Sequence, residues 1–275
     1  MSDLYLAAAA SAAAMLASFW LVMFLGWLTE TLFHKIMPVW LKVILTILVW
    51  AGACAGGYYW QLTRIQKADE SAKSGFVSEE YVTVHETDYG WFFDGWGTAN
   101  AAVFYGEKGI AEEAYAPLLK AVARQGTDCF LYKMPYADPA RQYDAYSEII
   151  AHHDWYRWFM MCHGSGCEAG SKYFTEHSGD FAGMITLGTY PMTDLKRTQL
   201  LITVVADKDP LMDTAAYEEA LKKTKAKTRE NTVRGGSHYG WAACGTVKGD
   251  GQAEITPALQ QVLTAQLIRQ TLIRE

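Results

Sequence analysis

Basic residues are not in excess in this 275-residue sequence, which has 24 Lys and Arg against 30 Asp and Glu and a formal net charge of −6. A surface that follows nucleic-acid phosphates normally carries more basic than acidic side chains. No basic stripe is present either, so we do not expect nucleic acid as a partner. Low-complexity segments are also missing, and a composition of 51% hydrophobic and 20% charged residues is that of an ordinary folded protein.

Motifs for cofactors and metal ions are missing too. No glycine-rich loop runs into Lys and then Ser or Thr, and no Gly-x-Gly-x-x-Gly opens a helix. The five cysteines lack the spacing of a metal site, so we expect neither a cofactor nor a metal ion. Outside the cytoplasm a Cys162–Cys167 or a Cys167–Cys244 disulfide is compatible with the sequence, which does not choose between them.

Charges are nearly absent from the first 60 residues. Those present are Asp3, Glu30, Lys35 and Lys42. The uncharged stretch 4–29 is longer than the roughly 20 apolar residues that cross a bilayer. A second stretch, 43–60, ends in aromatic residues that suit the headgroup level. We predict that residues 1–60 are a multi-pass anchor in the cell membrane, with the lipid bilayer as partner.

The alternative for the first stretch is a cleaved signal peptide. No Lys or Arg precedes it, and its apolar part exceeds the 7–15 residues of a signal core, so we favour a span. The side of the membrane is not fixed by charge. Lys35 and Lys42 lie between the two stretches, whereas Arg64, Lys67 and Lys73 follow the second.

The rest of the sequence has an α/β pattern. A polar linker is expected over 61–79, and in 80–275 short apolar stretches alternate with amphipathic ones. Expected strands are 81–85, 90–93, 101–105, 129–133, 158–162, 184–187, 201–206 and 231–234, and expected helices are 112–124, 138–152, 168–177, 214–223 and 257–274. Single crossover helices require parallel strands, and ligands then collect at their carboxyl ends. We predict a mostly parallel sheet with helices on both faces.

Several segments of this domain are characteristic. They are Thr83-Val-His-Glu-Thr-Asp, Glu113-Ala-Tyr-Ala-Pro-Leu-Leu-Lys, Phe130-Leu-Tyr-Lys-Met-Pro, Cys162-His-Gly-Ser-Gly, and Gly235-Gly-Ser-His-Tyr-Gly followed by Lys248-Gly-Asp-Gly-Gln. Through them the chain from Tyr58 to Glu275 resembles the α/β-hydrolase superfamily, in particular its small bacterial membrane-anchored members. The resemblance implies the α/β-hydrolase fold, a domain outside the cytoplasmic membrane, and a small ester or acyl ligand.

The family uses a nucleophilic Ser, then an acid, then a His. The resemblance places the acid at Asp209 and the base at His238. The family's nucleophile would fall on Gly164, which has no side chain, and no serine in the sequence has glycine two positions before and after it. Ser165 is a tentative replacement, although His163 then stands where a small residue is needed.

The loop that supplies the oxyanion donors also differs from the family pattern. Related members carry Gly-Gly after the strand 101–105, whereas this sequence reads Gly106-Glu107-Lys108. Losing one such donor lowers the rate on the order of a hundredfold or more. A carboxylate at Glu107 would also repel a developing oxyanion, and Lys108 would offset part of that repulsion.

Three functions remain open at this point. The first is an ester or acyl hydrolase that is impaired, atypical or inactive. The second is a non-catalytic binding or scaffold protein, a pseudoenzyme of the family. The third is a hydrolase that uses Ser165, or a water molecule activated by Asp209 and His238. The missing nucleophile and the altered oxyanion loop favour a protein in which serine-type catalysis is lost or strongly impaired. The sequence indicates no substrate, protein partner or oligomeric state.

Overall fold

Two apolar helices form the first unit of the chain. The computed structural model describes residues 2–34, 36–62, 64–153 and 157–275, and it divides into the units Met1–Arg64 and Ile65–Glu275. Helix α1 covers Ser2–Phe33 and α2 covers Val39–Leu62. Within them, Ser11–Leu32 and Val39–Trp60 are long and apolar enough to cross a membrane or, near the N-terminus, to act as a signal sequence.

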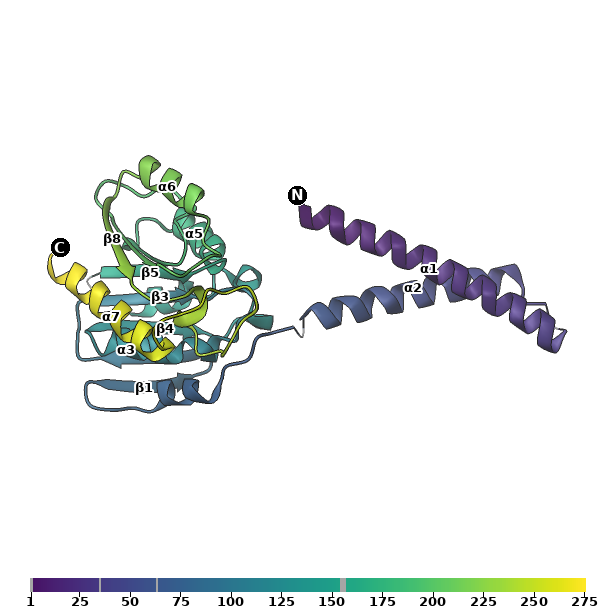
Figure 1. Ribbon diagram of the computed structural model, residues 1–275, viewed down its shortest axis with the longest axis horizontal. Coiled ribbons are helices and arrows are strands. Elements are labelled where there is room, and N and C mark those ends of the chain that lie inside the picture. The colour runs from purple at the N-terminus through teal and green to yellow at the C-terminus, as the bar shows by residue number, and fades with distance from the viewer. Residues whose placement is uncertain (1, 35, 63, 154–156) are drawn as a thin grey trace. The chain divides into compact units, whose positions relative to one another are not determined.

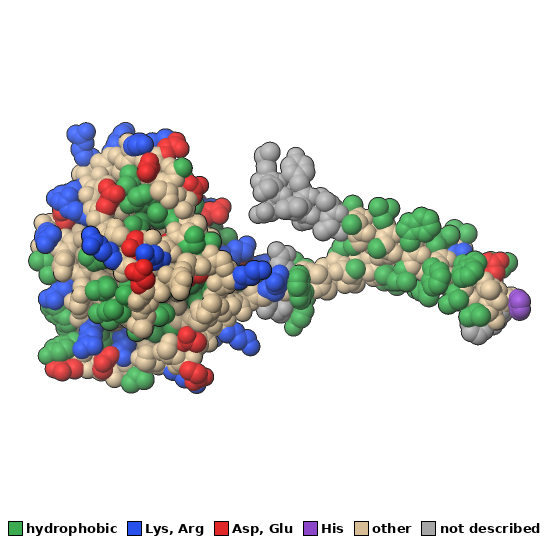
Figure 2. Space-filling model, viewed as in Figure 1, with side chains coloured by type: hydrophobic (Ala, Val, Ile, Leu, Met, Phe, Trp, Pro, Cys, Tyr) green, Lys and Arg blue, Asp and Glu red, His purple; other side chains and the backbone are tan. Residues whose placement is uncertain are grey.

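Most of the described side chains of this first unit are exposed, and many of them are apolar, as Figure 2 shows for both helices. Trp20 and Trp40 are 70% and 63% exposed. Between the helices, Trp50 Nε1 donates to the carbonyl oxygen of Ser11 at 3.1 Å. Apolar surface of this extent is unusual in water, and it suits a hydrocarbon solvent.

An eight-stranded sheet forms the centre of the second unit (Figure 1). The strands are β1 Val82–Thr87, β2 Gly90–Gly95, β3 Asn100–Tyr105, β4 Thr127–Tyr132, β5 Arg157–His163, β6 Phe181–Leu187, β7 Leu200–Ala206 and β8 Lys227–Val233. Their order is β1-β2-β4-β3-β5-β6-β7-β8, with β2 antiparallel to both neighbours and the other pairs parallel. The predicted mostly parallel sheet is confirmed.

Helices cover both faces of this sheet. They are η1 Glu70–Phe76, η2 Glu112–Tyr115, α3 Ala116–Ala123, η3 Pro135–Ala137, η4 Pro139–Gln142, α4 Ser147–His152, α5 Gly166–Glu176, α6 Thr214–Lys223, η5 His238–Trp241 and α7 Pro257–Ile273. Alternate residues of β3 face opposite layers, because side chains alternate along a strand. Ala102 and Phe104 join the apolar layer of α3 and α7, whereas Val103 and Tyr105 join that of α4 and α5.

The segment expected as a linker, 61–79, is partly built into the second unit. This unit begins at Ile65 rather than at residue 80. The Gln66 N–H donates to the Gly109 carbonyl at 2.7 Å. Asp69 Oδ1 then accepts the Ser71 N–H at 2.8 Å, and this cap begins η1 as a separate helix.

Two further elements differ from the expectation. The helix expected over 138–152 is divided into η4 and α4. The fully buried Tyr146 lies between them, and its hydroxyl accepts the Tyr132 N–H at 3.0 Å. Strand β8 begins at Lys227 instead of residue 231. Its first residues are polar and largely exposed while they pair with β7, so the sequence shows no apolar pattern there.

A buried acid in η2 makes stability depend on pH. Burial raises the pKa of Glu112 to about 7. The folded chain therefore holds this proton more tightly than the unfolded chain, and stability falls as the pH rises from about 4.5 to 7. Since one pKa unit corresponds to about 1.4 kcal/mol, the total loss is about 3 kcal/mol.

We expect Glu112→Gln to remove this loss. For a domain of this size, 3 kcal/mol corresponds to about 6 °C or more in the unfolding temperature. The variant should exceed the parent chain by that amount at pH 8 and match it near pH 4.5, as followed by thermal unfolding in detergent. Glu113→Gln, the adjacent acid, is the control, and an equal pH dependence in the parent and Glu112→Gln would contradict the assignment.

Candidate functional site

The candidate residues lie in loops at the carboxyl ends of β3, β5, β7 and β8. Gly106, Glu107 and Lys108 follow β3, Gly164 and Ser165 connect β5 to α5, Asp209 follows β7, and His238 begins η5 after β8. Parallel strands bring these ends to one edge of the sheet. The structure brings Glu107, Gly164, Asp209 and His238 together, and it leaves the side chains of Ser165 and Lys108 aside.

Asp209 and His238 form a buried hydrogen-bonded pair. Asp209 Oδ2 lies 2.7 Å from His238 Nδ1, and the two side chains are 0% and 5% exposed. The other oxygen, Asp209 Oδ1, accepts the N–H groups of Leu211 and Met212 at 2.8 and 3.1 Å. The carboxylate is therefore held from both sides, and it fixes the imidazole with a proton on Nδ1.

A second carboxylate is hydrogen-bonded to the other nitrogen of this imidazole. Glu107 Oε2 lies 2.8 Å from His238 Nε2. Burial by itself lowers the pKa of His238, but the hydrogen bonds to Asp209 and Glu107 outweigh it and raise the pKa to about 9. Burial by itself raises the pKa of Glu107, but the hydrogen bond from His238 holds it below its ordinary value. At neutral pH His238 is an imidazolium between two carboxylates.

Gly164 lies opposite the same imidazole nitrogen. Its φ of +50° belongs to the left-handed region that glycine adopts without steric cost. A β-carbon at this position would lie 3.1 Å from His238 Nε2 and 2.7 Å from Glu107 Oε2. A side chain at 164 would thus contact the imidazole, at the position where the family resemblance places the nucleophile. The carboxylate of Glu107 fills that space.

Close backbone packing brings the β3 loop over this turn. A β-carbon at Gly166, the first residue of α5, would lie 2.1 Å from the carbonyl oxygen of Gly106 and 2.7 Å from that of Tyr105. Helix α5 therefore starts directly against the end of β3. Glu107, the next residue of the loop, is placed within reach of His238.

Ser165 and Lys108 interact with each other instead of with His238. The Lys108 N–H donates to Ser165 Oγ at 3.1 Å, and Lys108 Nζ pairs with Asp138 at 3.0 Å. Among the described residues no hydrogen bond joins Ser165 to His238. The Glu107 N–H donates to the Tyr115 hydroxyl at 3.0 Å. Both of these loop amides already have acceptors, so the loop does not present them to a substrate oxygen.

His163 is a site residue that the sequence analysis considered only as an obstacle. It is fully buried, with Nδ1 2.9 Å from the Tyr115 hydroxyl and Nε2 3.1 Å from the carbonyl oxygen of His238. The carbonyl oxygen can only accept, so the imidazole proton lies on Nε2 and the Tyr115 hydroxyl donates to Nδ1. Burial lowers the pKa of His163 to about 3, which keeps it neutral.

Asp250 holds the segment that carries His238, a role that the sequence analysis did not assign. Its Oδ1 accepts the N–H groups of His238 and Gly251 at 2.9 and 2.8 Å. Its Oδ2 accepts from the Ser237 hydroxyl at 2.8 Å and the Tyr239 N–H at 3.1 Å. The signal was present in the sequence, because Lys248-Gly-Asp-Gly-Gln was one of the segments behind the family resemblance.

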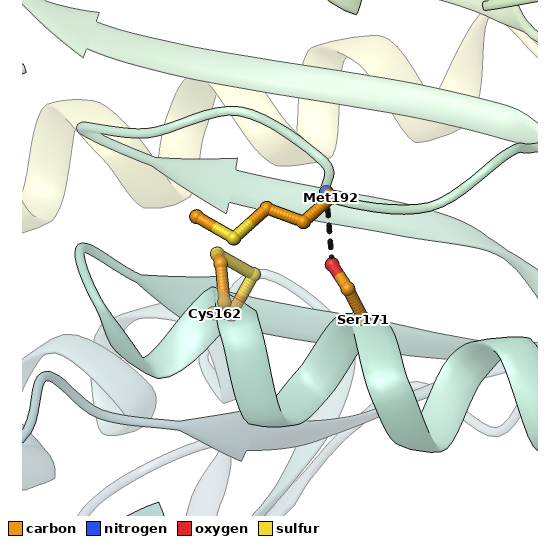
Figure 3. The surroundings of a disulfide bond; sticks show 4 residues. Cys162, Ser171 and Met192 are labelled. Atoms are coloured by element: carbon orange, nitrogen blue, oxygen red, sulfur yellow. Dashed lines mark hydrogen bonds between the residues drawn. A yellow bond between two sulfur atoms is a disulfide. The ribbon is translucent and has the colours of Figure 1, made fainter. Parts of the chain in front are cut away.

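A disulfide closes the turn around Gly164. It joins Cys162, near the end of β5, to Cys167 in the first turn of α5. Figure 3 shows it beside Met192, whose N–H donates to Ser171 Oγ at 3.0 Å. Of the two pairings that the sequence left open, the structure contains this one, and Cys244 is a buried free thiol.

One set of side chains in this site could hold a metal ion. Glu107 Oε2, His163 Nδ1 and His238 Nε2 lie within 4.8 Å of one another. They offer one carboxylate oxygen and two imidazole nitrogens, which are ordinary ligands of transition metals.

Comparison with known proteins supports the fold. The model of a family described as the alpha/beta hydrolase family matches residues 101–262. The structure is similar to dienelactone hydrolase from Anabaena variabilis, with a TM-score of 0.50 and 12% identity, covering 71% of this chain and 97% of that one. For Est1E from Butyrivibrio proteoclasticus the TM-score is 0.46, with 11% identity over 70% of this chain and 100% of the other.

A third similar structure is the ferulic acid esterase from Streptomyces cinnamoneus, with a TM-score of 0.49 and 13% identity over 64% of this chain and 67% of the other. A search of curated protein sequences finds no match. At 12% identity, the similarity to the dienelactone hydrolase shows a shared fold alone.

Proposed function

The chain belongs to the alpha/beta hydrolase family, and we propose that it is a membrane-anchored member that does not hydrolyse esters by the serine mechanism. One observation carries this proposal. The carboxylate of Glu107 is hydrogen-bonded to His238 Nε2 at 2.8 Å, and it fills the space of a side chain at Gly164.

The chemistry of a serine hydrolase requires a hydroxyl and an imidazole that accepts its proton. Gly164 supplies no hydroxyl, and Nε2 of His238 already donates its proton to Glu107. Ser165 Oγ is turned to the Lys108 amide. Loss of the nucleophile or the base of such a triad lowers kcat on the order of a millionfold. The same pairing of Nε2 with Glu107 argues against direct activation of a water molecule by His238.

The test uses the purified full chain in detergent with EDTA. We expect no covalent labelling by a fluorophosphonate probe, and p-nitrophenyl acetate turnover no higher than that of His238→Ala. Labelling of Ser165 that disappears in Ser165→Ala would contradict the proposal. Turnover that is lost in His238→Ala but kept in Ser165→Ala would contradict the argument against water activation and would assign the reaction to an activated water molecule.

The proposal that α1 and α2 anchor the chain rests on their length, their apolar composition and the exposure of their large side chains. The Cys162–Cys167 disulfide supports a location of the second unit outside the cytoplasm, because structural disulfides persist in oxidising compartments.

Both parts can be tested in cells. We expect the chain to remain in membranes washed with alkaline carbonate, with residues of α1 still present by mass spectrometry; a mature chain without α1 would indicate a signal sequence instead. A membrane-impermeant maleimide should label Ser71→Cys in intact cells, with the parent chain as control. Labelling only after the cells are opened would place the second unit in the cytoplasm.

A further inference from the structure

We propose that Glu107, His163 and His238 bind a divalent transition-metal ion such as Zn²⁺ beside Gly164. This inference goes beyond the proposed function but shares with it the position of Glu107 against His238. The spacing of the cysteines indicates no metal site. The three ligands come instead from the loops after β3 and β8 and from the end of β5.

The distances suit a common coordination geometry. Glu107 Oε2 lies 2.8 Å from His238 Nε2 and 3.8 Å from His163 Nδ1. Two ligand atoms of a tetrahedral zinc ion, each at about 2.1 Å from the metal, are about 3.4 Å apart. Both distances are within about 0.6 Å of this value. The third pair, His163 Nδ1 and His238 Nε2, lies within 4.8 Å and would have to approach this value as well. The result would be a site of two histidines and one glutamate, a ligand set that zinc enzymes use with a fourth position left open.

The hydrogen bonds on the far side of each imidazole provide independent support. His238 donates its Nδ1–H to Asp209, and His163 donates its Nε2–H to the carbonyl oxygen of His238. Metal-binding histidines almost always donate the other ring N–H to a carboxylate or a backbone carbonyl, which orients the ring. The His238 ring is thereby oriented with Nε2 toward Glu107 Oε2. His163 Nδ1 faces the Tyr115 hydroxyl at 2.9 Å and lies 3.8 Å from Glu107 Oε2.

Binding would replace two hydrogen bonds. The Tyr115 hydroxyl would lose its acceptor at His163 Nδ1, and the proton that His238 Nε2 donates to Glu107 would be released to solvent. Two of the three ligands are imidazoles, which suit zinc, copper, iron and nickel, whereas calcium and magnesium prefer oxygen ligands. We therefore expect selectivity for Zn²⁺ and Co²⁺ over Ca²⁺.

The experiment titrates the EDTA-treated, detergent-solubilised full chain with Co²⁺, and then displaces it with Zn²⁺. We expect one Co²⁺ per chain with visible absorption bands of a coordinated ion, complete displacement by one Zn²⁺, and no competition by Ca²⁺. Glu107→Gln should weaken binding at least tenfold. Asp209→Asn, which removes the partner of His238 Nδ1, should weaken it about 10- to 100-fold.

The control is His177→Gln, which changes a half-exposed histidine beside Asp180 and should leave binding unchanged. Because substitution of the fully buried His163 can prevent folding, the test relies on Glu107→Gln and Asp209→Asn, each checked for thermal unfolding. Absence of saturable Co²⁺ binding would overturn the proposal, and so would binding that both variants leave unchanged.

Failure here is distinct from failure of the proposed function, whose labelling test is run in EDTA. A chain that binds no metal and is not labelled overturns the metal site alone. A chain that binds Co²⁺ and is labelled at Ser165 keeps the metal site and overturns the loss of serine chemistry.

Discussion

Gly164→Ser combined with Glu107→Gly is expected to give a chain that fluorophosphonates label at position 164. The Asp209–His238 pair is in place, and a β-carbon at 164 would lie 3.1 Å from His238 Nε2. Removal of the Glu107 side chain frees both the space and the imidazole nitrogen. It also recreates the Gly-Gly loop that related hydrolases carry after this strand.

The single change Gly164→Ser should give a chain that fluorophosphonates do not label. Its β-carbon would lie 2.7 Å from Glu107 Oε2 and 2.9 Å from Glu107 Cδ, closer than non-bonded atoms approach. While the Glu107 carboxylate stays bonded to Nε2, His238 also cannot accept the proton of the new hydroxyl. The two substitutions should therefore act together, as expected for residues in direct contact.

We expect the labelling rate of the double variant to exceed that of the parent on the order of a hundredfold, the lower range of a positioned general base. The Lys108 amide, which donates to Ser165 Oγ, limits the gain. Glu107→Gly alone and the double variant with His238→Ala are the controls, both unlabelled. A double variant that unfolds at the parent's temperature but stays unlabelled would show that Gly164 is not the nucleophile position.

Asp250→Ala is expected to destabilise the second unit by about 3 kcal/mol or more, since hydrogen bonds to a charged group contribute about 1.5–3 kcal/mol each and are not additive. The carboxylate accepts four hydrogen bonds from Ser237, His238, Tyr239 and Gly251. Removing it leaves these donors without their acceptor and releases the segment that carries His238.

For a unit of this size, the unfolding temperature should fall by about 6–12 °C. Asp250→Asn should lie between the parent and Asp250→Ala, because its side-chain oxygen still accepts two of the donors. The matched control is Asp213→Ala, which removes the single cap bond to the Ala216 N–H at the start of α6 and should cost about 1 kcal/mol. Equal destabilisation by Asp250→Ala and Asp213→Ala would refute the role of Asp250.

The order of strands and helices could be predicted because the residues of most elements indicate whether they form a strand or a helix. Strand β3 is an uninterrupted apolar stretch, and α6 has both a capping Asp213 and lysines in its last turn. The start of β8 could not be predicted, because its polar residues form a strand through pairing with β7 and show no apolar pattern of their own. The division of the helix expected over 138–152 lies beside a contact between separate elements, the hydrogen bond of the Tyr146 hydroxyl with β4.

Single positions of the candidate site could be predicted, whereas contacts between residues of different loops could not. The positions of Gly164, Asp209 and His238 come from the family resemblance, and each residue lies in a segment that follows a strand. The pairing of Glu107 with His238 could not be predicted in this way, because the two residues come from different loops and meet only in space. The disulfide partner of Cys167 was open for the same reason.

The contact between Gly166 and the end of β3 has a consequence for how this site can vary. A methyl group added to Gly166 would collide with the Gly106 and Tyr105 carbonyl oxygens, so the helix and the strand would have to separate. Glu107 directly follows Gly106, and its carboxylate would retreat from the imidazole with its backbone. The place of Glu107 against His238 thus depends on glycine at the first residue of α5, and enlarging that residue would free the imidazole nitrogen without altering any group that bears charge.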